Sequence, residues 1–230
     1  MALLGGPDPT DTGLILALEP ANVVGTGTNW VDLSGTGNYT NGYKVGSMVN
    51  GISYNTSNGG CLSFDGSDDQ VKFDQGTNTG NPIYLTGAFT AMFWVKTSHN
   101  GGLFSHWSGG PVNLALAIDG PGKMNFYYYD GQWNSGQSTG TTVTTNNWVH
   151  LTWVRPVSNT GPVLMYVNGA LDFSLNPRIE WGNYNMGNIG AWWSFGYFNG
   201  LMGPVAVYNR ALSADEILKN YNINKGRFGL

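Results

Sequence analysis

Carboxylate side chains are the first residues to test for chemistry, because a glycosidic bond is cleaved between two carboxyl groups about 5 to 10 Å apart. The glutamates of this sequence are Glu19, Glu180 and Glu216. Glu19 precedes a proline, and Glu180 stands alone between two apolar residues. Glu216 is expected to cap a helix from its position three residues after Ser213. No pair is placed to face one bond, so the sequence argues against glycoside hydrolysis.

The other residue types that commonly catalyse reactions are also poorly arranged. His99, His106 and His150 do not fall at the i, i+2 or i, i+4 spacings of metal ligands. His150 belongs to an alternating strand pattern, which favours a hydrogen-bonded histidine in a sheet. Cys61 is the only cysteine, so no intrachain disulfide forms, and a small core or strand-edge residue is expected there. We expect no Gly-x-Ser-x-Gly nucleophile elbow and predict that the protein is not an enzyme.

One acidic segment could hold a metal ion. Hard cations such as calcium bind several carboxylate and carbonyl oxygens that a turn holds together, and Asp65-Gly-Ser-Asp-Asp69 offers such oxygens. The segment lacks the length and the terminal glutamate of an EF-hand loop. Aspartates in a turn also accept hydrogen bonds from local amides, which is the simpler explanation. We therefore predict that the protein has no cofactor. The alternative is a calcium ion, with Asp65 as the candidate ligand.

Aromatic residues in or beside glycine-, serine- and asparagine-rich stretches give the stronger binding signal. Indole and phenol rings stack on the C–H faces of sugars, while asparagine, aspartate and backbone groups bind the hydroxyls. The same residue types also suit a surface that binds another protein, and several must simply pack in the core. These three interpretations stay open for the predicted site, which consists of Trp107, Trp133, Trp181, Tyr184, Trp192, Trp193 and Tyr197.

The elements that would position these residues are mostly strands. In Phe89–Lys96, Phe89, Phe93 and other apolar residues alternate with Thr90, Trp94 and further residues that point to the opposite face. Asn168-Gly169 separates two apolar runs and permits the positive φ angles of a tight hairpin. Strand and turn signals recur along the chain at the spacing of a β-sandwich.

The end of the chain predicts a strand followed by one short helix. Residues 201–208 are apolar and β-branched enough for a buried strand. Ser213 and Glu216 have the spacing of a capping box, and Leu212 and Ile217 that of a hydrophobic staple. A helix should therefore begin near Ser213.

Several of these segments together resemble the laminin-G-like jelly rolls of the concanavalin A-like lectin and glucanase superfamily. The resemblance covers about residues 13 to 222 and implies an all-β, two-sheet antiparallel jelly-roll sandwich with one short C-terminal helix. Glucanases of the superfamily carry a Glu-x-Asp-x-Glu strand, which this sequence lacks. Relatives with a structural calcium ion use an Asp-Glu pair in the last strand, where this chain has Gly203-Pro204. The matching segments are Leu62-Ser-Phe-Asp-Gly-Ser-Asp-Asp-Gln-Val71, Phe89–Lys96, Asn147-Trp-Val-His-Leu-Thr-Trp-Val-Arg155, Met165-Tyr-Val-Asn-Gly169 and the strand end Tyr208-Asn-Arg-Ala-Leu-Ser213 with its helix.

The two ends of the sequence carry a narrower resemblance. Residues 13–18, 30–35 and 220–230 are similar to segments of structural proteins from tailed bacteriophages. This similarity implies a capsid decoration or tail-associated protein rather than a free lectin.

Composition limits the choice of partners. The 230 residues suit a single all-β domain. A net charge of −4 with only 10 lysines and arginines argues against binding to a phosphate backbone. The longest apolar run, residues 14–18, is far shorter than the roughly 20 residues that span a bilayer, and the first residues do not resemble a secretory signal. We therefore expect neither nucleic acid nor membrane as a partner.

The expected organisation is an extended arm at residues 1–12, a jelly-roll domain at 13–222 and a tail at 223–230. Leu3, Leu4, Pro7 and Pro9 in the arm are predicted to anchor the protein to a larger assembly, since prolines stiffen a chain that has no helical pattern.

Two functions from different classes fit these observations. The first is a non-enzymatic structural protein of a phage virion, assembled in the host cytoplasm as a homo-oligomer on the capsid or tail, with the major capsid or tail protein as its partner. The alternative is an extracellular carbohydrate-binding or adhesion module that binds cell-surface glycans.

Overall fold

The computed structural model describes residues 12–24, 27–35, 45–73, 84–85, 87–106, 114–129, 133–138, 140–156, 161–176, 184–185, 187–192 and 196–230. The anchor residues Leu3, Leu4, Pro7 and Pro9 lie outside these ranges, as do Trp107, Trp181 and Trp193. Side chains of Trp133 and Tyr184 are also outside the described part, although the backbone of both residues is included.

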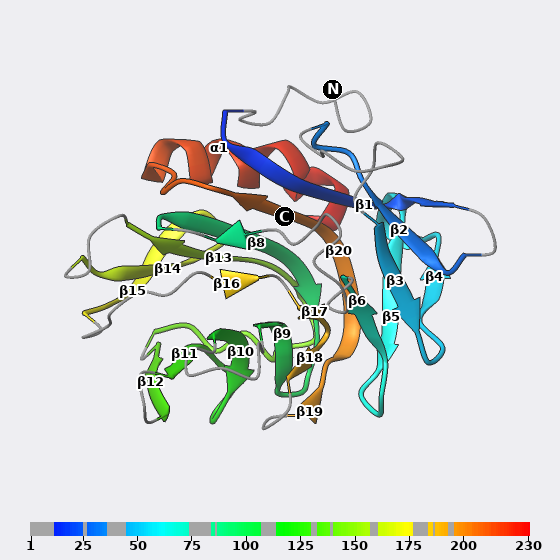
Figure 1. Cartoon of the computed structure of the whole chain (residues 1–230), viewed down its shortest axis with the longest axis horizontal. Helices are drawn as coiled ribbons and strands as arrows, with labels where there is room; N and C mark the ends of the chain where they lie inside the picture. The colour runs from blue at the N-terminus through cyan, green and yellow to red at the C-terminus, as the bar shows by residue number, and fades with distance from the viewer. Residues whose placement is uncertain are drawn as a thin grey trace.

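Strands dominate the described residues, and every described strand pair is antiparallel. The strands, labelled in Figure 1, are β1 Leu14–Val24, β2 Asn29–Asp32, β3 Val45–Val49, β4 Ser53–Asn55, β5 Cys61–Asp65, β6 Gln70–Lys72, β7 Tyr84–Leu85, β8 Phe89–Lys96, β9 Gly101–His106, β10 Leu114–Asp119, β11 Lys123–Tyr129, β12 Trp133–Gln137, β13 Trp148–Arg155, β14 Val163–Val167, β15 Ala170–Leu175, β16 Tyr184–Asn185, β17 Asn188–Ile189, β18 Ala191–Trp192, β19 Gly196–Tyr197 and β20 Asn199–Tyr208.

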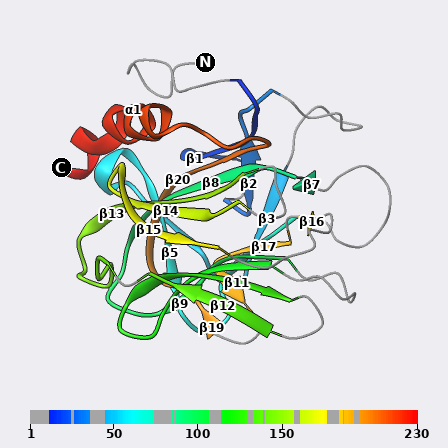
Figure 2. The same cartoon turned by 90° about the vertical axis from the view of Figure 1, so that its left-hand side faces the viewer.

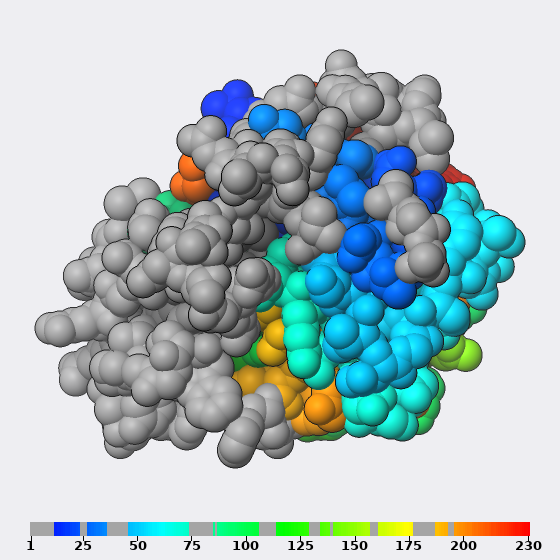
Figure 3. Space-filling model, turned by 45° about the vertical axis from the view of Figure 1, so that its right-hand side comes forward, coloured from blue at the N-terminus to red at the C-terminus, as the bar shows by residue number. Residues whose placement is uncertain are grey.

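The strands form two facing layers under one helix. The first layer has the order β1-β20-β8-β13-β14-β15, and the second has the order β12-β11-β10-β9-β17. Strands β6, β3 and β2 connect the two layers along one side, and Figure 3 shows the face that β2 to β6 form in blue and cyan. Helix α1, Ala214–Asn224, lies over the outer face of the first layer in both cartoon views (Figures 1 and 2). The structure thus confirms the predicted two-sheet antiparallel jelly roll with one short C-terminal helix.

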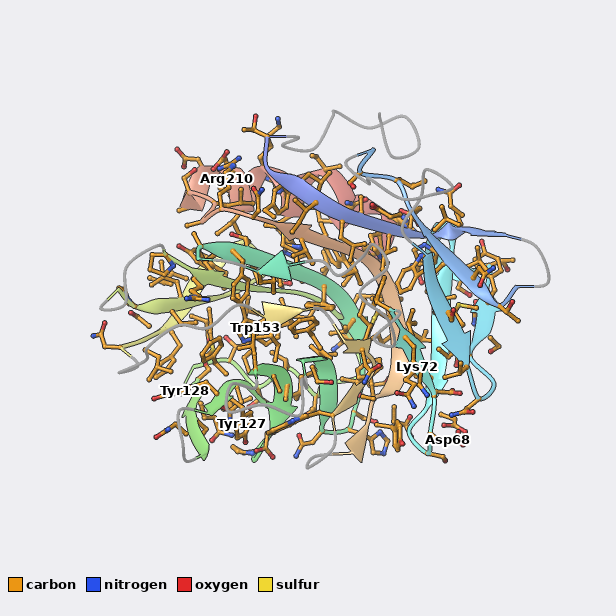
Figure 4. The ribbon with its side chains drawn as sticks, in the orientation of Figure 1. Asp68, Lys72, Tyr127, Tyr128, Trp153 and Arg210 are labelled. Atoms are coloured by element: carbon orange, nitrogen blue, oxygen red, sulfur yellow. The ribbon has the colours of Figure 1, made fainter. Side chains whose placement is uncertain are left out.

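Alternating side chains fill the space between the layers. Phe89, Phe93 and Val95 of β8 point into the main core, whereas Met92 and Trp94 point toward the helix. Figure 4 shows Trp153 of β13 between the layers. Its indole ring packs edge-on against Phe93, and its Nε1 donates to the Asn125 carbonyl of the other layer at 3.2 Å. Burial of each such side chain contributes about 1.5 to 3 kcal/mol, so the alternation fixes which face is internal.

The predicted hairpin and helix start are both confirmed. Asn168 and Gly169 have φ angles of 51° and 80° and connect β14 to β15. The hydroxyl of Ser213 accepts from the Glu216 amide, and the Glu216 carboxylate accepts from the Ser213 amide. Arg210 donates two hydrogen bonds to the same carboxylate. These bonds are the main reason that the pKa of Glu216 falls to about 2.

The end of the chain differs from the predicted extended tail at 223–230. Residues 223 and 224 complete α1, and Lys225–Phe228 forms a 3₁₀ turn, η2, that packs onto the sandwich. The Phe228 ring lies 4.4 Å from the rings of both Trp94 and Trp148. This segment was predicted as a tail because it has no local periodicity, while its partners lie far away in the sequence.

Arg227 ties the end of the chain to the first strand. Its guanidinium donates to both carboxylate oxygens of Glu19, at 2.8 and 2.9 Å, and also to the carbonyls of Asn58 and Gly60. Glu19 has no exposed surface, so its charge depends on this partner.

Arg227→Ala should therefore lower the free energy of unfolding by about 3 to 5 kcal/mol, because it leaves the Glu19 carboxylate buried without a counter-charge. Lys219→Ala, which removes the same charge from the exposed side of α1, should cost less than about 0.5 kcal/mol. Urea denaturation of both variants measures the difference. Equal stability of the two variants would contradict the assigned role of the ion pair.

Candidate ligand-binding surfaces

Strands β9, β10, β11 and β12 each have one terminus at the same end of the sandwich. His106 at the end of β9 pairs with Leu114, Leu114 pairs with Tyr128, and Tyr129 pairs with Trp133. Trp107 follows His106 directly in the sequence. Because neighbouring strands lie about 4.8 Å apart, the strand ends at His106 of β9 and Trp133 of β12 lie within roughly 15 Å of each other.

Tyr184 belongs to the same end. It pairs with Leu85, which lies four residues before β8 begins. Residues 97–100 form a short connection from the end of β8 to the start of β9. The start of β8 and the end of β9 therefore lie at the same end of the sandwich, which we call the aromatic end.

The opposite end is closed by short turns joined through side chains. Asn199 donates to the Asp65 carbonyl at 3.0 Å, and Thr97 donates to the Asn199 carbonyl at 2.6 Å. Asn100 donates to the Gly120 carbonyl at 2.9 Å, and the Asn146 amide donates to the Thr97 carbonyl at 2.8 Å. These bonds satisfy backbone groups at the turns, and we call this region the turn end.

Trp192 does not join the residues of the aromatic end. It is only 6% exposed and lies on the outer face of the second layer, with its ring 4.4 Å from that of Tyr127. A Cβ on Gly102 would lie 2.6 Å from the Cβ of Trp192, so the sheet can accept the tryptophan only over a glycine. Tyr197, which is partly exposed, pairs with Ala191 beside it. Of the three interpretations of the aromatic residues, packing within the protein therefore fits the surroundings of Trp192.

A polar network beneath Trp192 was missed by the sequence analysis. The Tyr127 hydroxyl donates to the Asp119 carboxylate and accepts from the Asn125 amide at 2.9 Å. Burial, followed by the hydrogen bond to Asp119, raises the pKa of Tyr127 well above its usual range. Figure 4 labels Tyr127 and its neighbour Tyr128 on β11. The signal was present, since Asn125 and Tyr127 alternate with core residues along that strand.

Both glutamates that the structure describes are engaged by arginines. Glu19 is held by Arg227, and Glu216 is shared between the helix cap and Arg210. Glu180 lies outside the described residues. Residues 136–140 do match Gly-x-Ser-x-Gly in letters, but their serine, Ser138, follows strand β12 and donates to Asp172 instead of standing on a turn into a helix.

His150 is buried between α1 and the first layer. Its ring lies 4.9 Å from that of Trp94, and burial lowers its pKa to about 3, so it is neutral. Its backbone amide donates to the Asn168 side chain at 2.9 Å, and its ring Nδ1 is buried without a hydrogen-bond partner among the described residues. Together with Met92, Tyr208 and Asn220, His150 lines a cavity of about 50 Å³. A group that stays neutral and enclosed is poorly suited to acid–base catalysis.

The predicted metal candidate Asp65 lies at the turn end. Its carboxylate accepts from the Ser67 amide at 2.7 Å. Oxygens of Asp65, Asp68 and Asp69 lie within 4.8 Å of one another, and Asp69 is the buried member of the group. The local turn interpretation thus accounts for one oxygen of Asp65 and one oxygen of Asp69, which accepts from the Asp65 amide at 2.9 Å.

The arrangement of two antiparallel layers, a C-terminal helix and an aromatic end is that of a lectin-like jelly roll. The chain belongs to the concanavalin A-like lectin/glucanases superfamily, whose laminin-G family model matches residues 65–218. No described helix has the length and apolar character needed to cross a membrane. A comparison with curated protein sequences gave no significant match.

Solved structures with the same fold include binding domains of two kinds. Domain 4 of AbnA, a GH43 extracellular arabinanase from Geobacillus stearothermophilus, in complex with arabinotriose, is 20% identical with a TM-score of 0.64; the match covers 90% of this chain and 98% of that chain. The binding domain of botulinum neurotoxin serotype D is 17% identical with a TM-score of 0.65, over 92% and 52% of the two chains. The serotype D ligand-binding domain in complex with N-acetylneuraminic acid is 16% identical with a TM-score of 0.61, over 92% and 51%. This chain therefore spans about half the length of the neurotoxin chains, and these identities establish the shared fold alone.

Trp192→Ala should lower the free energy of unfolding by about 3 to 5 kcal/mol, because it removes a buried indole from the face of β9 and β11. Tyr54→Ala, at a tyrosine that is 45% exposed, should cost about 0.5 kcal/mol. Chemical denaturation of the two variants compares them. A Trp192 variant as stable as the Tyr54 variant would show that the ring does not support the sheet.

Proposed function

We propose that the protein is a non-enzymatic recognition module and that its ligand is a glycan bound at the aromatic end. The observation that supports this most directly is the convergence of strand ends that includes His106, which precedes Trp107 in the sequence, and the backbone of Trp133 and Tyr184. Several aromatic rings placed within roughly 15 Å can stack on successive sugar rings. Tyrosine hydroxyls, tryptophan N–H groups and loop amides then bind the sugar hydroxyls.

The state of the described glutamates supports binding without cleavage. Hydrolysis needs one carboxyl group as an acid and a second as a base or nucleophile. Glu19 and Glu216 are both committed to arginines, and the pKa of Glu216 near 2 prevents it from acting as an acid at neutral pH. The aromatic end can therefore hold a sugar without these carboxylates attacking it.

The relatives of known structure favour the same class of ligand. One was solved in complex with arabinotriose and another with N-acetylneuraminic acid. These names do not identify the sugar for this chain, and the match covers 98% of the arabinanase domain but only 51% of the serotype D chain.

The full-length protein should bind at least one glycan saturably on an array that includes arabino-oligosaccharides and sialylated glycans. Trp107→Ala and Trp133→Ala should each weaken that binding about tenfold, which corresponds to about 1.4 kcal/mol for one lost stacking partner. Tyr54→Ala, an exposed tyrosine on β4, serves as the matched control and should bind like the wild type.

Chromatography of the glycan after prolonged incubation should show an unchanged chain length. Absence of saturable binding, or equal binding by all three variants, would contradict the glycan proposal. Cleavage of the bound glycan would contradict the non-enzymatic part alone.

We further propose that this module is displayed on the surface of a tailed-phage virion, after assembly in the host cytoplasm. The support is the resemblance of residues 13–18, 30–35 and 220–230 to structural proteins of such phages. The major capsid or tail protein would be the partner, with the chain present as a homo-oligomer. Extracellular display on a cell is the alternative setting, in which the same aromatic end would act as an adhesion site.

In the virion setting Leu3 and Leu4 supply apolar contacts to the partner, and Pro7 and Pro9 restrict the free chain before it binds. Leu3→Asp and Leu4→Asp should abolish binding to undecorated particles without lowering the melting temperature. Leu230→Asp, which changes an exposed leucine at the other end of the chain, should bind normally. Cosedimentation with particles measures occupancy, and full occupancy by both arm variants would exclude the arm as the anchor.

A further inference from the structure

The turn between β5 and β6 concentrates negative charge at the turn end. Asp65, Asp68 and Asp69 each offer a carboxylate oxygen within 4.8 Å of the other two. Figure 4 shows Asp68 at the tip of this turn. The ion pairs of the described residues, Arg210 with Glu216 and Arg227 with Glu19, lie elsewhere. Three carboxylates at this spacing repel one another unless a positive charge joins them.

Asp69 gives the second, independent observation. It is only 2% exposed, and its Oδ2 accepts from the Asp65 amide at 2.9 Å. Its other oxygen, Oδ1, is buried without a hydrogen-bond partner among the described residues. A buried carboxylate oxygen without a partner is costly, so this side chain indicates a missing positive ligand.

The electrostatics of Asp69 agree with that geometry. Burial raises the pKa of Asp69, and the charges of Asp65 and Asp68 raise it further, against the effect of the Asp65 amide. A cation would reverse these contributions, since it stabilises the ionised form that burial disfavours.

The turn is held in place before any ligand binds. The Asn50 side chain donates to the Asp68 carbonyl at 2.9 Å, and the Asn199 side chain donates to the Asp65 carbonyl at 3.0 Å. Asn50 belongs to the turn after β3 and Asn199 to β20, so two other segments fix the backbone of the acidic turn. Little ordering of the backbone is then needed when a ligand binds.

We propose that Asp65, Asp68 and Asp69 form a binding site for a hard divalent cation the size of calcium. All three ligands are carboxylates, which calcium accepts in flexible geometry with 6 to 8 oxygens at about 2.3 to 2.6 Å. Asp65 and Asp68 are exposed, so water can complete the coordination. Magnesium requires near-octahedral geometry at about 2.0 to 2.1 Å and loses water reluctantly, so it should bind more weakly. This site is separate from the aromatic end and does not rest on glycan binding.

The full-length protein, stripped with a chelator, should bind calcium chloride at one site in isothermal titration. A dissociation constant of about 10⁻⁴ to 10⁻³ M is expected for a site that is partly open to solvent. At 10 mM calcium the melting temperature should rise by about 3 to 10 °C. Magnesium chloride titrated in the same way should bind at least tenfold more weakly.

Asp68→Asn changes an exposed side chain and should weaken calcium binding at least tenfold without affecting the fold. Asp69→Asn keeps an oxygen for the Asp65 amide and should weaken binding by at least as much. Asp215→Asn, at an exposed aspartate of α1, is the matched control and should bind like the wild type. No saturation up to about 20 mM calcium, which exceeds the expected dissociation constant at least twentyfold, would overturn the proposal. Wild-type calcium affinity in Asp68→Asn would also overturn it. Equal affinity for magnesium would overturn its assignment to a calcium-sized ion.

Discussion

The requirement to cover both faces of the β8–β13 strand pair governs the rest of the structure. One face of these strands fills the core between the layers, and the other carries Met92, Trp94 and His150. A sheet that is apolar on both faces needs a second cover, which α1 and the Phe228 ring supply. The buried Glu19 and Arg227 pair then holds that cover to the first strand. This face of the sheet is therefore part of the packed structure, and the proposed glycan site lies away from it at the aromatic end.

Local features of the fold could be predicted from the sequence, whereas the packing of the chain end could not. The alternation in β8, the Asn168-Gly169 hairpin and the Ser213 cap each depend on residues within a few positions of one another, so their pattern is complete in a short window. Residues 225–230 show no such pattern, because Arg227 and Phe228 are fixed by Glu19, Trp94 and Trp148, which lie far away in the sequence. Contacts with residues far away in the sequence determine the structure of such a segment, so a local sequence pattern cannot predict it.

The same distinction explains the mixed outcome for the candidate site. Composition selects aromatic residues near loops, but it cannot say which side of a strand is open. Trp192 is covered because Gly102 lets it lie against the sheet, a condition set by a residue 90 positions away. The end of β9 at His106 and the start of β12 at Trp133 come together only through the register of four strands. The alternation of Asn125 and Tyr127 was readable, although their link to Asp119 required the pairing of β10 with β11.

The two ends of the sandwich have different physical characters, and this division suits a recognition module. At the turn end, short turns are joined by Asn100, Asn199 and Thr97, so their backbone groups are satisfied by fixed partners. Stability can be concentrated there, because the described hydrogen bonds of Asn100, Asn199 and Thr97 join turn segments of that end. We expect substitutions in the loops beyond the strands at the aromatic end to leave the fold intact, since the core and the turn end already hold the strands in register.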